Sequence, residues 1–254
     1  MAGIITRRKL IAGLAAGGSS VALSAWTGPT YNPFFQDRVL SIGEWLNYRA
    51  QRLIVGNALA QEFPESDMSQ VFRTNGNTDP GTPEYERLAA GQFADWRLQI
   101  DGLVASPASY SLTELRAMPS RTQITRHDCV EGWSAIAKWT GVQLGPLLKQ
   151  AGLQPNARFI VFHCADAFDG TPYYESIDLV DAFHPQTLLA YAMNDEPLSV
   201  GHGAPLRLRV ERQLGYKHAK YVMRVEAVAV LSGIGGGGGG YWEDAADYYW
   251  YAGV

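Results

Sequence analysis

The strongest constraint on the fold is an irregular alternation of short β-rich and short helical segments between residues 96 and 231. Ser111 and Glu114 have the spacing of a helix capping box, and the helical pattern of 144–151 stops at Gly152. Strand-like composition is found at 96–102, 123–126, 158–163, 187–193, 206–210 and 221–231. Because no regular strand–helix–strand repeat joins these segments, the sequence predicts an α+β domain with short helices.

Composition excludes several classes of protein. The chain has 254 residues, of which 46% are hydrophobic, and this supports a packed core. Its 21 basic and 25 acidic residues give a formal net charge of -4, which is too balanced for a general polyanion binder, so nucleic acid is not an expected partner. Two cysteines exclude a disulfide-stapled miniprotein and a cysteine-rich metal array, but they allow one bridge or one special thiolate.

Residues 1–25 have the order of an export signal. Arg7, Arg8 and Lys9 precede an uncharged run that reaches Ala25, and glycines make this run a poor permanent membrane anchor. The paired arginines resemble a twin-arginine signal, which predicts export to the periplasm of a protein that is already folded. The alternative is an ordinary basic N-terminus on a flexible arm.

The rest of the chain divides into three parts. Residues 26–90 are punctuated by prolines, contain a predicted helix within 41–59, and are expected to wrap around the core formed by 91–232. Residues 233–254 combine a glycine run with an aromatic tail. The glycine run contains a nominal dinucleotide-binding pattern, but it is interpreted as a flexible loop without a following helix, while the tail is expected to pack back onto the body.

Cys129 follows a predicted strand directly, a position that presents its sulfur at a loop. As a thiolate it could act as a nucleophile or as a soft metal ligand. The alternatives are an inert buried thiol or a disulfide with Cys164 in an oxidising compartment. Zinc held with His127 and His163 does not match a standard ligand spacing, and nothing marks the base or oxyanion hole of a cysteine hydrolase.

A second group of basic residues lies at 202–207 and 215–220. Arginine offers a fork of donors suited to phosphate, and lysine next to glycine-freed backbone N–H groups suits the same anion. These stretches predict either a phosphate-binding site or a solvated basic edge between two strands.

Five ordered motifs taken together point to one family. They are Cys-Val-Glu-Gly-Trp at 129–133 and the segments 138–142, 174–178, 184–188 and 202–220. Over roughly 91–231 the chain resembles the oxidoreductase molybdopterin-binding domain of the sulfite oxidase superfamily, and most of all its exported bacterial branch, which includes periplasmic methionine sulfoxide reductases. The resemblance implies a mixed-sheet α+β domain, a molybdopterin cofactor, and an enzyme that moves an oxygen atom and two electrons.

The resemblance also implies roles for individual residues. Cys129 would be the protein thiolate on molybdenum and hence catalytic, and Tyr241 would be an active-site tyrosine. Pterin and phosphate contacts would come from Asn75 in an N-terminal loop, Cys164 or Asp166, His202, Arg207, His218, Ala219 and Lys220.

Two departures from the family shape the expected function. Sulfite oxidases carry an arginine directly before the counterpart of Asn75, where this chain has Thr74, with Arg73 one residue earlier. Sulfite is therefore not the favoured substrate. The export signal and the lack of a recognised dimerisation domain favour reduction of an S-oxide or N-oxide such as methionine sulfoxide, with sulfite oxidation as the runner-up. No dimerisation or haem domain is recognised, so we expect a monomer and a separate electron partner, either a membrane haem protein or a soluble carrier. Outside this class, the alternative is a disulfide-bonded periplasmic binding module or a cofactor-binding protein without turnover.

Overall fold

The computed structural model describes residues 41–54 and 58–254 and divides the chain into two compact units, Met1–Asn47 and Tyr48–Val254. The predicted signal segment 1–25 lies outside the described residues. Helix α2, Ser41–Ile54, begins where the sequence predicts a helix and ends before the predicted limit. Within these two ranges no helix is both long enough and apolar enough to cross a bilayer.

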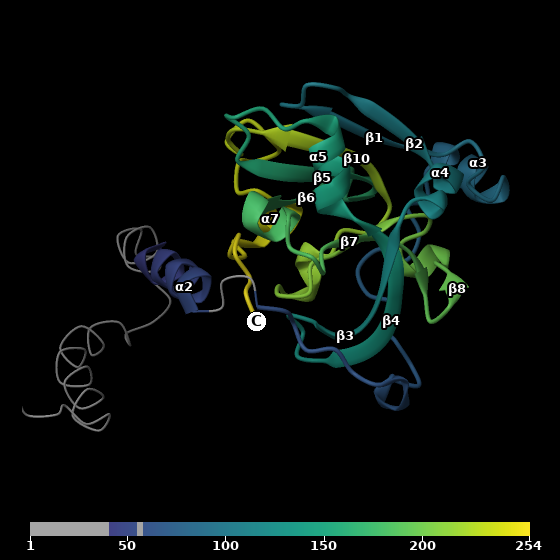
Figure 1. Cartoon of the computed structure of the whole chain (residues 1–254), viewed down its shortest axis with the longest axis horizontal. Coiled ribbons are helices and arrows are strands. Elements are labelled where there is room, and N and C mark those ends of the chain that lie inside the picture. The colour runs from purple at the N-terminus through teal and green to yellow at the C-terminus, as the bar shows by residue number, and fades with distance from the viewer. Residues whose placement is uncertain (1–40, 55–57) are drawn as a thin grey trace, which may run out of the picture. The chain divides into compact units, whose positions relative to one another are not determined.

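The second unit is built on two sheets (Figure 1). The first has the order β2, β1, β10, β5, β6, and its strands are Ala108–Ser111, Arg97–Gly102, Val222–Val228, Phe159–Phe168 and Thr171–Asp178. Strand β1 runs parallel to β10, whereas the other pairs are antiparallel. This mixed sheet with short helices confirms the predicted α+β fold class.

The second sheet carries the strands that lead to the candidate site. Its order is β3, β4, β7, β8, with the bounds Ser120–Asp128, Ser134–Gln143, Leu188–Met193 and Glu196–Pro197. The short strand β9, Arg207–Arg209, also pairs with β7. Every pair in this sheet is antiparallel. Figure 1 shows the long β3–β4 hairpin below the first sheet.

Short helices lie before, between and after the strands. They are α3, Pro83–Ala90; α4, Leu112–Ala117; α5, Leu144–Ala151; α6, Leu179–Ala182; and α7, Tyr241–Ala246. Single turns of 3₁₀-helix lie at Glu65–Asp67, Val200–His202 and Gly215–Lys217. The predicted capping box is confirmed, because Ser111 accepts from the Glu114 backbone N–H and the Glu114 carboxylate accepts from that of Ser111. Gly152 ends α5 as the pattern predicts.

The main core joins the two sheets through aliphatic and aromatic side chains. Leu98 on β1, Ile160 on β5, Leu208 on β9 and Val225 on β10 are fully buried in one cluster with Leu148 of α5. Burial of each such side chain contributes about 1.5–3 kcal/mol to folding. Strand β9 is therefore fixed by its central leucine, and this fixes the arginines on either side of it.

Two sequence expectations are wrong. Cys129 and Cys164 are both free, so the predicted alternative of a disulfide between them does not hold. The glycine run is also followed by a helix, because Gly240 is the N-cap of α7. The Asp244 carboxylate in this helix accepts the backbone N–H groups of Gly236 and Gly238 and thereby fixes the loop. The aromatic tail packs back as predicted, with Trp250 Nε1 donating to Ser176 Oγ over 2.9 Å.

Candidate active site

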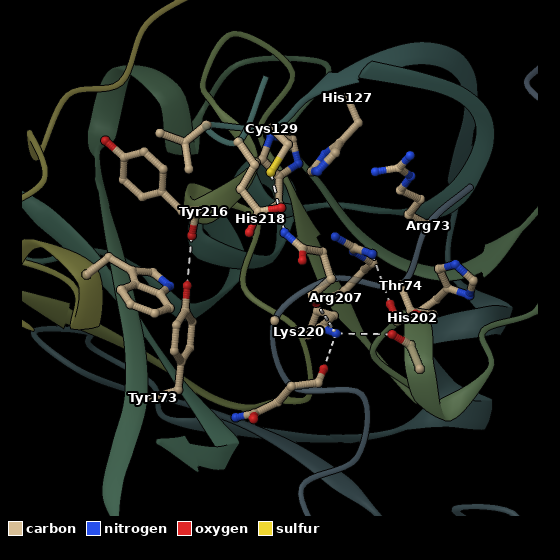
Figure 2. A pocket seen from close by; sticks show the side chains of 18 of the residues that line it. Arg73, Thr74, His127, Cys129, Tyr173, His202, Arg207, Tyr216, His218 and Lys220 are labelled. Atoms are coloured by element: carbon tan, nitrogen blue, oxygen red, sulfur yellow. Dashed lines mark hydrogen bonds between the residues drawn. The ribbon is translucent and has the colours of Figure 1, made fainter. Parts of the chain in front are cut away.

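One cavity of about 880 Å³, measured with its open mouth, collects most of the predicted site residues (Figure 2). Its walls come from the segments 72–77, 127–133, 166–173 and 201–220 and from the C-terminal tail. Seven of the residues predicted from the sequence line it: Asn75, Cys129, Asp166, His202, Arg207, His218 and Lys220. Segments that are distant in the sequence are therefore brought to one site by the fold.

Cys129 is presented by a tight loop at the end of β3. Its backbone N–H donates to Trp133 O over 2.9 Å, and Gly132 N–H donates back to Cys129 O over 3.0 Å. Gly132 has a φ of 85°, a conformation that favours glycine. The sulfur points into the cavity (Figure 2), where the Asn75 side-chain amide donates to Sγ over 3.4 Å. The loop holds the sulfur in place without a disulfide.

The electrostatics of Cys129 suit a thiolate whose charge is balanced by a ligand. Burial raises the pKa of the Cys129 thiol, and the negative charge of Glu131 adds to this effect. Hydrogen bonds from the Asn75 amide and from the backbone at Val130 and Glu131 act in the opposite direction. A metal cation at the sulfur would offset the cost of the buried charge and keep the thiol deprotonated.

Arg207 brings a buried positive charge to the same cavity without a matching carboxylate. Arg207 is 5% exposed and its Nη1 donates to His202 O over 3.0 Å, whereas the buried Nε has no hydrogen-bond partner among the residues that the structure describes. Burial, together with the neighbouring charge of Arg209, lowers the pKa of Arg207 to about 9. A guanidinium in this state is available to an anion, which favours the predicted phosphate-binding site over a solvated basic edge.

Lys220 lies beside Arg207 but is already engaged by the protein. Its ammonium donates to Asn75 O over 2.9 Å, to Gly201 O over 3.0 Å and to Asn77 O. Burial and the charge of Arg207 lower the pKa of Lys220 to about 7, while Asp166 opposes that shift. A direct contact between this ammonium and a phosphate stays a prediction.

Neutral histidines and one carboxyl group supply polar atoms to the cavity. Nε2 of His218 hydrogen-bonds Gln213 O over 3.0 Å, and Nδ1 is buried with no partner within residues 41–54 and 58–254. Burial, followed by the charge of Arg209, lowers the pKa of His218 well below its usual value, so the ring is neutral and Nδ1 is an acceptor. Asp166 accepts from Asn77 through Oδ2 over 3.1 Å, and its Oδ1 is buried with no partner in the described part of the chain. A ligand with several N–H groups would satisfy both atoms.

His202 has both ring nitrogens occupied. Nδ1 lies 2.9 Å from Ser199 Oγ, and Nε2 lies 3.2 Å from Phe72 O. Burial lowers the pKa of His202. The ring therefore joins the 72–77 segment to the turn before β9, while its own cofactor contact remains a prediction.

Three predicted residues do not line this cavity. Cys164 on β5 packs against the main core, and burial raises the pKa of its thiol well above the usual value. The Ala219 side chain is buried in the same core. Tyr241 begins α7, stacks on Phe168 at 5.0 Å between ring centroids, and lines a neighbouring cavity instead. The sequence motifs place these three residues in the right order along the chain, but they do not show towards which cavity or core each side chain points.

Sequence reasoning missed the aromatic part of the wall. Trp133, Tyr216, Trp242 and Tyr248 line the cavity. His127 also lines it, and the sequence offered this residue only as a zinc ligand or as the base of a cysteine hydrolase. The concentration of aromatic residues in the tail was the one available signal. Among residues 41–54 and 58–254, no group of three or more His, Cys, Asp or Glu could hold a metal ion, so the zinc hypothesis finds no ligand set there.

This donor set fits a cofactor that carries a soft metal, a phosphate and a ring rich in N–H groups. The Cys129 sulfur suits the metal, the unpaired Arg207 guanidinium suits the phosphate, and the two orphaned acceptors suit the ring. Without a ligand, each of these buried and unpaired groups lowers the stability of the folded protein. A bound ligand that pairs with them removes this cost.

Comparison with known proteins identifies the family. The model of the family described as "Oxidoreductase molybdopterin binding domain" matches residues 86–232. The chain is 40% identical over 197 residues to the "Putative protein-methionine-sulfoxide reductase subunit YedZ1" of Azospira oryzae, a match that covers 78% of this chain and 69% of that protein. It is 30% identical over 235 residues to the protein-methionine-sulfoxide reductase catalytic subunit MsrP of Ralstonia nicotianae, covering 87% and 68%.

Among solved structures, the sulfane dehydrogenase SoxCD of Paracoccus pantotrophus matches with a TM-score of 0.49 and 26% identity, over 54% of this chain and 39% of that one. The family match and the two relatives agree with the donor set of the cavity. The chain therefore belongs to the oxidoreductase molybdopterin-binding domain family of the sulfite oxidase superfamily and is a molybdenum oxidoreductase that uses molybdopterin.

Proposed function

We propose that this protein reduces an S-oxide, with methionine sulfoxide as the representative substrate. The observation that carries the proposal is the presence of a ligand-ready sulfur, Cys129, in the same cavity as the buried and unpaired guanidinium of Arg207. The bound cofactor supplies two-electron oxygen-atom transfer at molybdenum. The names of the relatives, which are methionine sulfoxide reductase subunits, support this direction of the reaction.

Different residues of the chain would bind different parts of the cofactor. Cys129 would ligate the metal, and Arg207 would form charge-assisted hydrogen bonds with the phosphate. Asp166 Oδ1 and His218 Nδ1 would accept hydrogen bonds from ring N–H groups. The chain thus contributes orientation and charge balance.

The wall around Cys129 suits a substrate with apolar substituents. Trp133, Tyr216 and Tyr248 provide aromatic surface, and Thr74 is uncharged at the position where sulfite oxidases are expected to carry arginine. A neutral sulfoxide flanked by carbon atoms can contact this surface without leaving a charge unpaired.

Sulfite oxidation is the second candidate, and one observation favours it. Arg73 also lines the cavity, and Figure 2 shows its guanidinium at the edge of the site. Among the described residues no ion pair occupies this group within 4.0 Å, so an anionic substrate could use it.

The location and the electron supply complete the proposal. The order of basic and uncharged residues in 1–25 supports export to the periplasm through the twin-arginine route. Two-electron reduction of an S-oxide needs an electron donor, for which we propose a separate membrane haem protein or soluble carrier. The word "subunit" in the names of both relatives supports an assembly with more than one component.

The test is a substrate screen on protein purified from molybdenum-replete cells. Wild type and Cys129→Ser are assayed with a reduced dye against methionine sulfoxide, dimethyl sulfoxide and trimethylamine N-oxide, and with an oxidised acceptor against sulfite. We expect sulfoxide turnover by the wild type and a loss of at least about 100-fold in Cys129→Ser, with Cys164→Ala as the matched cysteine control. Faster turnover of sulfite than of any oxide would replace the first candidate with the second, and undiminished turnover in Cys129→Ser would overturn both.

A further inference from the structure

The 74–78 loop reaches the cavity from the N-terminal segment, outside the residues matched by the family model. It contains no helix or strand, and in the described parts of the chain its backbone forms no backbone–backbone hydrogen bond. Even so, the loop holds the Asn75 side-chain amide against the sulfur of Cys129, although the two residues are 54 positions apart in the sequence. Side chains from elsewhere must therefore fix this loop.

Lys220 provides most of that support. An ammonium has three N–H donors, and those of Lys220 meet three backbone carbonyls: Asn75 O, Asn77 O and Gly201 O. Tyr221 adds a hydrogen bond from its hydroxyl to Asn77 O over 3.0 Å. The two carbonyls that flank Gly76 are thus held on one side of the loop, which leaves the Asn75 side chain directed at the sulfur.

The chain makes room for this arrangement. Gly203 has a φ of 100°, and a Cβ at that position would lie 2.8 Å from the Cβ of Lys220. Only glycine lets the stem of Lys220 pass so close to the turn before β9. From the opposite end of the loop, Asn77 Nδ2 donates to Ala167 O over 2.9 Å and to Asp166 Oδ2 over 3.1 Å. The loop is therefore held at both ends.

We propose that Lys220 is a positioning residue whose ammonium holds the Asn75–Asn77 carbonyls so that the Asn75 amide remains on the Cys129 sulfur. The proposal rests on the proposed role of Cys129 as metal ligand. An N–H donor on a ligand sulfur draws electron density from it, and hydrogen bonds to ligand sulfurs are one means by which proteins set a reduction potential. Lys220 would thus tune the metal through Asn75 without contacting it.

This role differs from that of a phosphate anchor. An anchor needs at least one N–H free to meet the anion, whereas all three donors of Lys220 are directed at carbonyls. The charged groups that face Lys220 are Arg207 and Asp166. Arg207 retains an unpartnered Nε and is the better placed of the two cations for the phosphate.

The first test uses the holoenzyme variants Lys220→Met, Asn75→Leu and the double variant. Molybdenum content is measured together with the midpoint potential and the Mo(V) resonance. We expect near wild-type loading, a shift to lower potential of the same size in both single variants, and no further shift in the double variant. Lys138→Met, a lysine with carboxylate partners away from the cavity, should leave the potential unchanged. Additive shifts, or loss of molybdenum in Lys220→Met alone, would overturn the proposal in favour of a phosphate anchor.

A second test does not depend on the metal. In full-length protein from molybdenum-depleted cells, the pH dependence of Cys129 alkylation reports the pKa of its thiol. Loss of the Asn75 hydrogen bond should raise that pKa equally in Lys220→Met and Asn75→Leu, and an unchanged profile in Lys220→Met would overturn the link. If instead the proposed function is wrong, the wild-type protein shows no Mo–thiolate signal, but the two variants still raise the pKa of the Cys129 thiol in the alkylation experiment. If Lys220→Met does not fold, Lys220→Gln replaces it with the same direction of change.

Discussion

Arg207 and Arg209 lie two residues apart on β9 and place their guanidinium groups on the same ring, 4.9 and 4.3 Å from the centroid of Trp139. Their charge environments differ. Arg209 is fully buried and pairs with Glu211 over 2.6 Å, whereas Arg207 forms no ion pair in the part of the chain that the structure describes. One arginine thus belongs to the fold, and the other is available to a ligand.

The first prediction separates these two arginines. In cofactor-free protein, Arg207→Met should raise the free energy of unfolding by about 1–4 kcal/mol because it removes an uncompensated buried charge. Arg209→Met should lower it by about 3–5 kcal/mol because the buried Glu211 carboxylate loses its cation and keeps only neutral donors such as Gln123 Nε2. Urea unfolding measures both changes. In cells that supply the cofactor, Arg207→Met should lose molybdenum loading. Full loading, or destabilisation equal to that of Arg209→Met, would contradict this assignment.

The second prediction concerns the two thiols. Burial raises the pKa of Cys129, and it raises that of Cys164 well above its usual value. Since only the thiolate reacts, iodoacetamide should label Cys129 at least about tenfold faster than Cys164 in cofactor-free protein. Mass spectrometry of digested samples gives both rates. The holoenzyme should protect Cys129, and equal labelling with and without cofactor would argue against a metal on that sulfur.

The third prediction concerns a buried charge cluster that joins two walls of the cavity. Lys217 pairs with Glu175 on β6 and Glu243 on α7, and all three side chains are buried. Burial, followed by the charge of Glu243, raises the pKa of Glu175 well above its usual value. In Lys217→Met, both carboxyl groups would remain buried without a cation. We expect this to lower the free energy of unfolding by about 3–5 kcal/mol at pH 8.

The sign of the pH dependence follows from that raised pKa. A carboxyl group with a folded pKa above its unfolded value contributes stability at low pH and loses it as the pH rises through the folded pKa. The loss in free energy of unfolding of Lys217→Met relative to wild type should therefore become smaller from pH 8 towards pH 5, when urea unfolding is measured at each pH. The double variant with Glu243→Gln should recover part of the loss at pH 8. A deficit independent of pH would show that packing, rather than charge, accounts for the effect.

The fourth prediction tests substrate charge at the cavity. Thr74→Arg would place a guanidinium next to Asn75, where sulfite oxidases are expected to carry one. A charge-assisted hydrogen bond is worth about 1.5–3 kcal/mol, so KM for sulfite should fall by at least about tenfold while KM for methionine sulfoxide does not improve. Steady-state kinetics with both substrates measures the change, and a parallel improvement for both would refute selection by charge.

Much of the fold could be predicted because its signals are local. The Ser111–Glu114 box and the Gly152 cap depend on neighbouring residues and were placed correctly. Strands β2, β4, β6 and β8 were missed as strands. Burial on β6 runs over six successive residues, so its pattern lacks the alternation that marks a half-buried strand. Helix α7 was missed because it has six residues and follows a glycine run.

The candidate site was predictable only in part. Ordered motifs placed Asn75, Cys129 and Arg207 in one function, and the structure brings all three to one cavity. The direction of each side chain depends on tertiary contacts, and this is why Tyr241 lines a different cavity. The difference between Arg207 and Arg209 likewise has no sequence signal, since it depends on which guanidinium meets Glu211.

The bond between the Cys129 sulfur and the metal is the central feature of the proposed site. X-ray absorption at the molybdenum edge counts the sulfur neighbours of the metal in wild type and Cys129→Ser prepared side by side. We expect one sulfur neighbour fewer in the variant. The same sulfur count in both proteins, or folded wild type without molybdenum from replete cells, would contradict it.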